Sequence, residues 1–274
     1  MRVRVPSRKD FRRKYRVLAF HEAISDFLRA CKQTPEWGNV RLVLLLDEFT
    51  DIYNQIRKHK ISRDFMKTWK SFLEKRYFSA VHVGQDTMPA FKAEFPNEFG
   101  VTQDERITYL AEDDARMMIE SPIGAARFGG RAIARILELT ACSPFYTMML
   151  CNRLVEYINR HKAVVVTEAD IEHLKTSVIS GHNPITLDKF NPLLSAGEGL
   201  VDTGIDPADS LAICTAIAKN AQFGWCPESL IDCGEKEQRA FILQDLVERG
   251  VIDKHAGQYR IRVGLFSEWL SCNG

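Results

Sequence analysis

A run of aliphatic residues ends abruptly in two carboxylates at residues 42–48, and this run constrains the fold more than any other stretch. Residues 42–46 are all Leu or Val, without the alternation of a half-exposed strand, and the run is too short to span a membrane. It predicts a strand buried on both faces, as in parallel sheets covered by helices. Ligands of open α/β sheets bind beyond the carboxyl ends of strands, so Asp47 and Glu48 are predicted to lie at a ligand site.

The surrounding segments predict a parallel α/β sheet. Apolar residues at three- and four-residue spacing indicate helices at residues 17–31 and 62–75, and a second strand is expected at 79–83. Alternation of helix and strand is typical of parallel sheets with right-handed crossovers. Two strands make a poor sheet, so a third is expected at residues 106–110 and a fourth within the first few residues.

Beyond residue 110 the sequence becomes helical, with stops at Ser121-Pro122 and Ser143-Pro144. Near the C-terminus, three predicted helices are followed by two short strands around Ala256-Gly257, which is a winged-helix arrangement. We therefore expect an α/β fold combined with all-α parts. The expected divisions are a partial nucleotide domain at 1–110, a helical lid at 111–180, a linker rich in Gly and Pro at 181–206, and a winged-helix domain at 207–274.

The composition excludes the disordered, collagen-like and membrane classes of protein. With 45% hydrophobic and 27% charged residues, the chain is an ordinary globular sequence, and no apolar run resembles a membrane span or secretory signal. We expect a cytoplasmic protein without membrane partners. The seven cysteines are scattered and never spaced as Cys-x-x-Cys, and no histidine pair has metal-binding helical spacing, so no zinc site is predicted.

The order of these features resembles the AAA+ ATPases, especially the branch that contains the signal-transducing STAND ATPases and the archaeal and origin-recognition ATPases. The resemblance covers about residues 17–272. In that family, residues 42–48 would form the Walker B strand. The resemblance implies that ATP and Mg²⁺ are cofactors, with Asp47 holding the ion through water and Glu48 orienting or deprotonating the attacking water. Phosphoryl transfer needs this charge neutralisation and placement of water.

Two further positions carry the resemblance. Gln85 is similar to the first sensor residue, which touches the γ-phosphate or the water, although Asp86 beside it would repel phosphate. Residues 139–146 resemble the lid motif Gly-x-Pro, in which Pro144 would pack near the adenine, although Cys142 stands where glycine is usual.

The family's phosphate-binding loop, Gly-x-x-x-x-Gly-Lys-Ser/Thr, does not occur in this sequence. Without its backbone amides and lysine, the triphosphate loses its main anchor. The chain is therefore expected to be either a fragment or truncated reading frame of an ATPase, or a relative that has lost nucleotide binding. Its expected partners are the missing P-loop portion or other protein domains that the winged helix would contact.

A second interpretation is a non-catalytic winged-helix protein that binds DNA or is associated with transposition. The helix at residues 235–249 would enter the groove and the hairpin would flank it. The basic N-terminus, with eight Lys and Arg in the first sixteen residues, could also touch nucleic acid or an acidic partner. Acidic residues on the same helix weaken its attraction for phosphate. The candidate DNA-binding residues are Lys236, Arg239, Lys254, Arg260 and Arg262.

Overall fold

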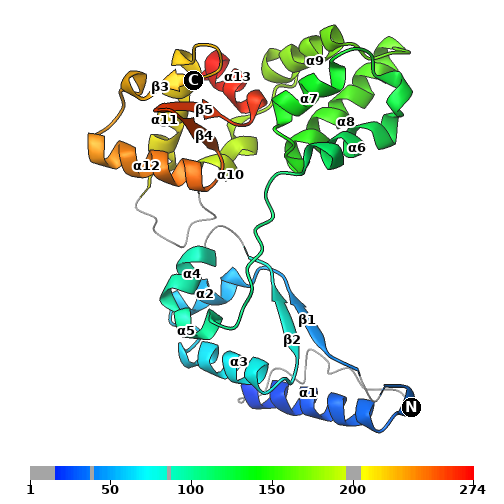
Figure 1. Ribbon diagram of the computed structural model, residues 1–274, viewed down its shortest axis with the longest axis vertical. Helices are drawn as coiled ribbons and strands as arrows, with labels where there is room; N and C mark the ends of the chain where they lie inside the picture. The colour runs from blue at the N-terminus through cyan, green and yellow to red at the C-terminus, as the bar shows by residue number, and fades with distance from the viewer. Residues whose placement is uncertain (1–15, 38–39, 85–87, 196–204) are drawn as a thin grey trace. The chain divides into compact units, whose positions relative to one another are not determined.

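The computed structural model describes residues 16–37, 40–84, 88–195 and 205–274, and the elements reported below belong to these ranges. The chain divides into two compact units, the first ending at Gln103 and the second beginning at Asp104. Each unit combines helices with a small sheet, so the chain is mixed α/β and mostly helical, as predicted (Figure 1). No described helix is both long and apolar enough to cross a lipid bilayer.

The first unit is built around two parallel strands. β1 (Val43–Leu46) pairs with β2 (Ser79–His82), with Val43 opposite Ser79 and Leu46 opposite His82. This confirms the predicted parallel pairing. The helices of the unit are α1 (Arg16–Lys32), α2 (Thr50–Arg57), α3 (Asp64–Glu74), α4 (Met88–Glu94) and α5 (Pro96–Phe99), with a short 3-10 helix η2 (Pro35–Trp37) before β1.

The two faces of this sheet differ. Leu44, Leu46 and Ala80 pack on an aromatic core, and Figure 1 shows α2 to α5 gathered on one side of the strands. On the other face, Leu45 is 76% exposed, and Val43 and Val81 are about half exposed. The prediction that residues 42–46 are buried on both faces is therefore wrong. The described helices cover one face only, so an all-aliphatic strand alternates between packed and exposed side chains.

The predicted third strand is also wrong. Residues 106–110 form no strand and belong to the second unit. Arg106 Nη1 donates to the carbonyl of Glu248 at 2.7 Å, and Tyr109 Oη donates to that of Gly250 at 2.9 Å. The segment thus bonds to the C-terminal part of its own unit instead of to the sheet. The fourth strand, expected within the first few residues, lies outside the described residues.

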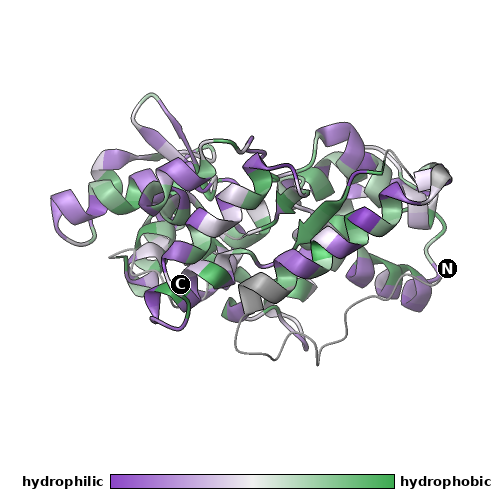
Figure 2. Cartoon of the chain, turned by 90° about the horizontal axis from the view of Figure 1, so that it is seen from below, coloured by the Kyte–Doolittle hydropathy of each residue, from purple (hydrophilic) through white to green (hydrophobic). Residues whose placement is uncertain are grey.

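The second unit begins with a group of helices, and Figure 2 shows that hydrophobic and hydrophilic residues are mixed along the helices of the chain. Proline at the first helical position starts α8, and Thr167 and Asp170 form a capping box that starts α9. Helix α7 ends at Ala141, and the backbone of both Ala141 and Cys142 has a left-handed conformation. The elements are α6 (Glu112–Ile123), η3 (Ala125–Arg127), α7 (Ala132–Thr140), α8 (Pro144–His161) and α9 (Glu168–Ser180).

The C-terminal part of this unit places helices beside an antiparallel sheet of order β3-β5-β4. The β4–β5 hairpin turns through Ala256 and Gly257, which both have positive φ as a tight two-residue hairpin turn requires. The elements are α11 (Pro207–Asn220), β3 (Cys226–Pro227), η5 (Glu228–Leu230), α12 (Lys236–Glu248), β4 (Ile252–His255), β5 (Gln258–Ile261) and α13 (Gly264–Asn273).

One hydrophobic core runs through the second unit. It contains residues of the helical group, such as Leu150, together with residues of the C-terminal part, such as Phe266. The segment expected to be a linker contributes to this core as well. Its 3-10 helix η4 (Leu187–Phe190) and its short helix α10 (Asn191–Leu194) bury Phe190 and Leu194, so this stretch packs within the unit.

Candidate functional site

Asp47 and Glu48 directly follow β1, at the carboxyl end of the two-stranded sheet. Backbone hydrogen bonds hold this end together: Val83 N donates to Leu46 O, and Phe49 N donates to Val83 O, both at 2.8 Å. The ladder of backbone hydrogen bonds between the two strands therefore continues past their last residues. The two acidic residues lie in the turn that leaves the sheet and enters α2, beside the residues that follow β2.

The turn has a specific shape. The backbone N–H of Glu48 donates to Oδ1 of Asp47 at 2.9 Å, and Glu48 itself has φ of 52°. A left-handed conformation costs a non-glycine residue roughly 1–2 kcal/mol, so the surrounding structure has to hold it. Both side chains are exposed. The turn thus presents one carboxylate oriented by its neighbour's amide and a second carboxylate on a strained residue.

A cluster of aromatic side chains packs beneath this turn, on the side that faces the core. Phe49 is 2% exposed and stacks on His82 with ring centroids 3.9 Å apart. Trp69 Nε1 donates to His82 Nε2 at 3.0 Å, and burial lowers the pKa of His82. His82 is therefore a partly buried, neutral residue of β2 that packs against Phe49 and Trp69. Sequence reasoning placed His82 within its strand but did not identify this aromatic cluster, although Phe49 and Tyr53 show helical spacing.

Gly84 brings the chain after β2 close to the start of α2. A Cβ atom at this position would lie 2.8 Å from Cγ2 of the buried Thr50 and 2.4 Å from the flexible Cε of Met88. Only glycine allows this approach without displacement of α2 or Met88. Gln85, the predicted sensor residue, and Asp86 lie outside the described residues.

The acidic turn fits a magnesium ion held together with phosphate better than a complete protein-bound metal site. Mg²⁺ is commonly bound by one or two carboxylates, with waters and substrate phosphates completing the octahedron. Asp47 and Glu48 match that donor set. Within the described ranges, no group of three or more His, Cys, Asp or Glu side chains is arranged to hold a metal ion.

Pro144 occupies the first position of α8 in the second unit and is exposed. The chain reaches it through Ala141 and Cys142, with φ of 51° and 59°, so Cys142 adopts the backbone conformation that favours glycine. Its carbonyl accepts a hydrogen bond from Leu110 N at 3.0 Å. Asp47 and Glu48 belong to the first unit, so the candidate ATP-site residues come from two separate units.

The candidate DNA-binding residues are unequally available for contact. Lys236, at the start of α12, is exposed, and Arg239 lies 3.9 Å from Asp232. Lys254 lies over the ring of Tyr259, 5.2 Å from its centroid. These three side chains come from two elements of the same part of the second unit, α12 and the β4–β5 hairpin.

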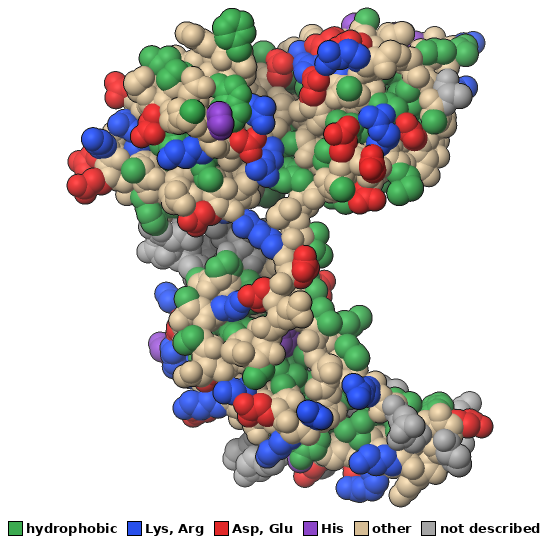
Figure 3. All heavy atoms as spheres, viewed as in Figure 1, with side chains coloured by type: hydrophobic (Ala, Val, Ile, Leu, Met, Phe, Trp, Pro, Cys, Tyr) green, Lys and Arg blue, Asp and Glu red, His purple; other side chains and the backbone are tan. Residues whose placement is uncertain are grey.

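The two hairpin arginines are bound to one aspartate. Arg260 Nη2 and Arg262 Nε each lie 2.9 Å from a carboxylate oxygen of Asp253. Burial opposes ionisation of Asp253, but the hydrogen bonds and charges of both arginines lower its pKa overall. Arg260 also lies over the ring of Trp225. Positive and negative side chains are interspersed over the face of the second unit seen in Figure 3, without a continuous basic surface.

No protein-family model matches this sequence, and a search of curated proteins found no significant match.

Proposed function

We propose that this chain is a partial or degenerate STAND/AAA+ ATPase that acts as a nucleotide-controlled switch or regulatory module. In this proposal the first unit is part of the nucleotide domain, helices α6 to α9 are the lid, and α11 to α13 with the β4–β5 hairpin are a winged helix. The chain would not hydrolyse ATP alone, since its sequence has no phosphate-binding loop.

The observation that carries this proposal is an open sheet that ends in two acids. Parallel strands are normally covered on both faces, and isolated pairs of strands are marginal. Here Val43, Leu45 and Val81 expose an aliphatic face while Asp47 and Glu48 stand at the carboxyl end. A partner that supplies a P-loop, a further strand and a covering helix would bury this face and bring phosphate to the acids.

The described residues would have distinct roles in such an assembly. When bound, Mg²⁺ and ATP would supply charge neutralisation and the transferred phosphoryl group. Asp47 would hold the ion through water, and Glu48 would orient or deprotonate the attacking water. Gln85 would act as sensor and Pro144 would pack near the adenine. The left-handed backbone at Glu48 sets the direction in which its side chain leaves the turn.

A titration of the isolated chain with Mg-ATP, followed by amide NMR, tests this function. We expect weak, millimolar binding that shifts the amides of residues 47–50 and 83–84, and no micromolar affinity. Asp47→Asn should remove these shifts, while Asp51→Asn, in the first turn of α2, serves as the matched acidic control. Micromolar binding would contradict the proposed incomplete site, and the lack of any shift at millimolar Mg-ATP would contradict a nucleotide site.

The second candidate is the non-catalytic winged-helix protein that binds DNA or takes part in transposition. The helices and antiparallel hairpin of the C-terminal part favour it, whereas the pairing of Arg260 and Arg262 with Asp253 opposes it. Salt-sensitive DNA binding that is lost on Arg239→Ala and Arg262→Ala would support this candidate.

A further inference from the structure

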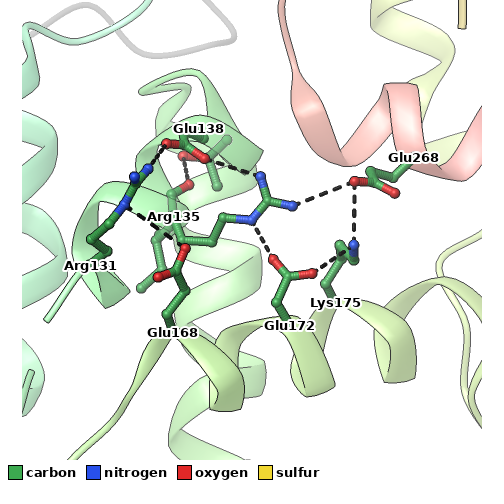
Figure 4. A network of polar contacts seen from close by, with 9 residues as sticks. Arg131, Arg135, Glu138, Glu168, Glu172, Lys175 and Glu268 are labelled. Atoms are coloured by element: carbon green, nitrogen blue, oxygen red, sulfur yellow. Dashed lines mark hydrogen bonds and ion pairs between the residues drawn. The ribbon is translucent and has the colours of Figure 1, made fainter. Parts of the chain in front are cut away.

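A polar network lies where the C-terminal helix α13 meets α7 and α9 in the second unit (Figure 4). Arg135 of α7 is at its centre. Its guanidinium pairs with Glu172 of α9, with Glu138 Oε2 at 3.1 Å, and with Glu268 Oε1 of α13 at 3.5 Å. One side chain thus connects three helices that are far apart in the sequence.

Lys175 forms a second connection to the same acid. Its Nζ lies 2.8 Å from Glu172 Oε2 and 3.3 Å from Glu268 Oε1. Lys175 and Arg135 are 15% and 21% exposed, so both cations are partly shielded from solvent. Oε1 of Glu268 is therefore shared by two cations, one from α7 and one from α9.

The charged side chains of the network that come from the helical group are equal in number of cations and carboxylates when Glu268 is left out. The members from the helical group are three cations, Arg131, Arg135 and Lys175, and three carboxylates, Glu138, Glu168 and Glu172. These six charges balance without help from α13. Glu268 is the one acid of the network that comes from the C-terminal part, so its removal leaves the helical side paired.

Apolar packing brings Glu268 to this place. Gly264, at the start of α13, approaches α7 so closely that a Cβ would lie 2.6 Å from the carbonyl oxygen of Glu138. Phe266 is fully buried, 4.7 Å from the ring of Phe190, and Trp269 Nε1 donates to Ile185 O at 2.9 Å. Helix α13 is thus docked on both sides of Glu268, and the acid projects toward α7 and α9.

We propose that Glu268 is a salt-sensitive positioning residue that fixes the orientation of α13 on α7 and α9. Through this contact, the helical group and the C-terminal part of the second unit move as one body. The proposal concerns the coupling inside this unit and does not rest on nucleotide binding. An ion-pair network is more strongly coupled than isolated surface pairs. Because Glu268 itself is 39% exposed, salt still screens its pairs with Arg135 and Lys175, although less than it screens fully exposed pairs.

Hydrogen exchange of the full chain, read by mass spectrometry on peptides of α13 and α7, tests the proposal. We expect Glu268→Gln to speed exchange in α13 about 5-fold, because the two cations lose their shared acceptor. Glu156→Gln is the matched control, since Glu156 is an exposed acid on α8 that pairs only with Arg153 among the described residues. Equal exchange in both variants would overturn the proposal.

The dependence of exchange on salt distinguishes an electrostatic role of Glu268 from docking of α13 by apolar packing alone. Raising salt from about 50 mM to about 500 mM should speed exchange of α13 in the wild type and have little effect in Glu268→Gln. A double-mutant cycle with Lys175→Met should show that the two changes are not additive. Additive effects, or a wild type insensitive to salt, would overturn the assignment. If Glu268→Gln folds poorly, Lys175→Met gives the comparison instead, because it removes the α9 cation that pairs with the same carboxylate oxygen.

Discussion

Trp69 donates a hydrogen bond from its indole Nε1 to Nε2 of His82, 3.0 Å away, beneath the turn that carries the two acids. Because Nε2 accepts, the neutral imidazole must carry its proton on Nδ1. A second proton would go onto Nε2 and remove the acceptor. The ring is also stacked on Phe49, in surroundings that disfavour a charge. The support of the acidic turn therefore depends on the protonation state of one histidine.

We predict that the first unit loses stability as the pH falls below about 6.5, the ordinary pKa of histidine. Burial lowers the pKa of folded His82, so the unfolded chain binds this proton first. The contribution to the free energy of unfolding is complete above the unfolded pKa and decreases as the pH falls toward the folded pKa. Urea unfolding between pH 8 and pH 5 should reveal this decrease. It should be smaller in His82→Asn and unchanged in His59→Asn, which alters an exposed histidine of the same unit.

Adjacent leucines of β1 should respond oppositely to truncation. Leu44 packs against the aromatic core, whereas Leu45 is 76% exposed. We expect Leu44→Ala to cost roughly 2–3 kcal/mol and Leu45→Ala to stay within about 0.5 kcal/mol, as judged by urea unfolding. Leu45→Lys should also reduce binding of a hydrophobic dye to the open face. A large loss from Leu45→Ala would show that something covers this face in the free chain.

Local patterns predict much of this fold, because helices carry their periodicity and stop signals within themselves. The helix expected at residues 62–75 is α3, which spans Asp64–Glu74, and the hairpin at Ala256-Gly257 occurs as expected. The predictions that were wrong concern which segments pack against or bond to one another in the folded chain. The aliphatic run of β1 shows that its side chains are apolar but not what covers them. Ile107 and Tyr109 favour a strand locally, yet Tyr109 bonds to Gly250, which no local pattern shows.

The candidate site divides in the same way. A strand followed by Asp47 and Glu48 predicts where the acids lie, because the carboxyl end of a parallel strand is fixed by chain direction. The left-handed φ of Glu48 and the support from Phe49 and His82 depend on the folded environment. These features have no counterpart in residue spacing.

Gly84→Ala should strain the contact between the end of β2 and the start of α2. The added methyl would meet Cγ2 of Thr50 at 2.8 Å, and this buried side chain has little room to move. We expect a loss of roughly 1–3 kcal/mol in the free energy of unfolding, as for other overpacked sites. Thr50→Ser removes that methyl group and should recover part of the loss in the double variant. If the two changes were simply additive, the contact would not be the cause.

The final prediction separates structure from DNA binding at the hairpin. Asp253 holds both Arg260 and Arg262, and their charges keep its pKa low despite burial. A carboxylate with a lowered folded pKa stabilises the fold above its unfolded pKa and loses that contribution as the pH falls through the folded value. Asp253→Asn should therefore lower the melting temperature at pH 7 and make much less difference near pH 3.

If the hairpin contacts DNA, Asp253→Asn also frees two arginines and removes one repelling charge. Affinity for DNA should then rise, and the dependence of binding on salt should become steeper by about one to two phosphate contacts. Glu237→Gln, on the exposed start of α12, is the control for a general loss of negative charge. If Asp253→Asn destabilises the hairpin but DNA binding remains undetectable, the arginines serve the fold alone and the DNA-binding candidate fails.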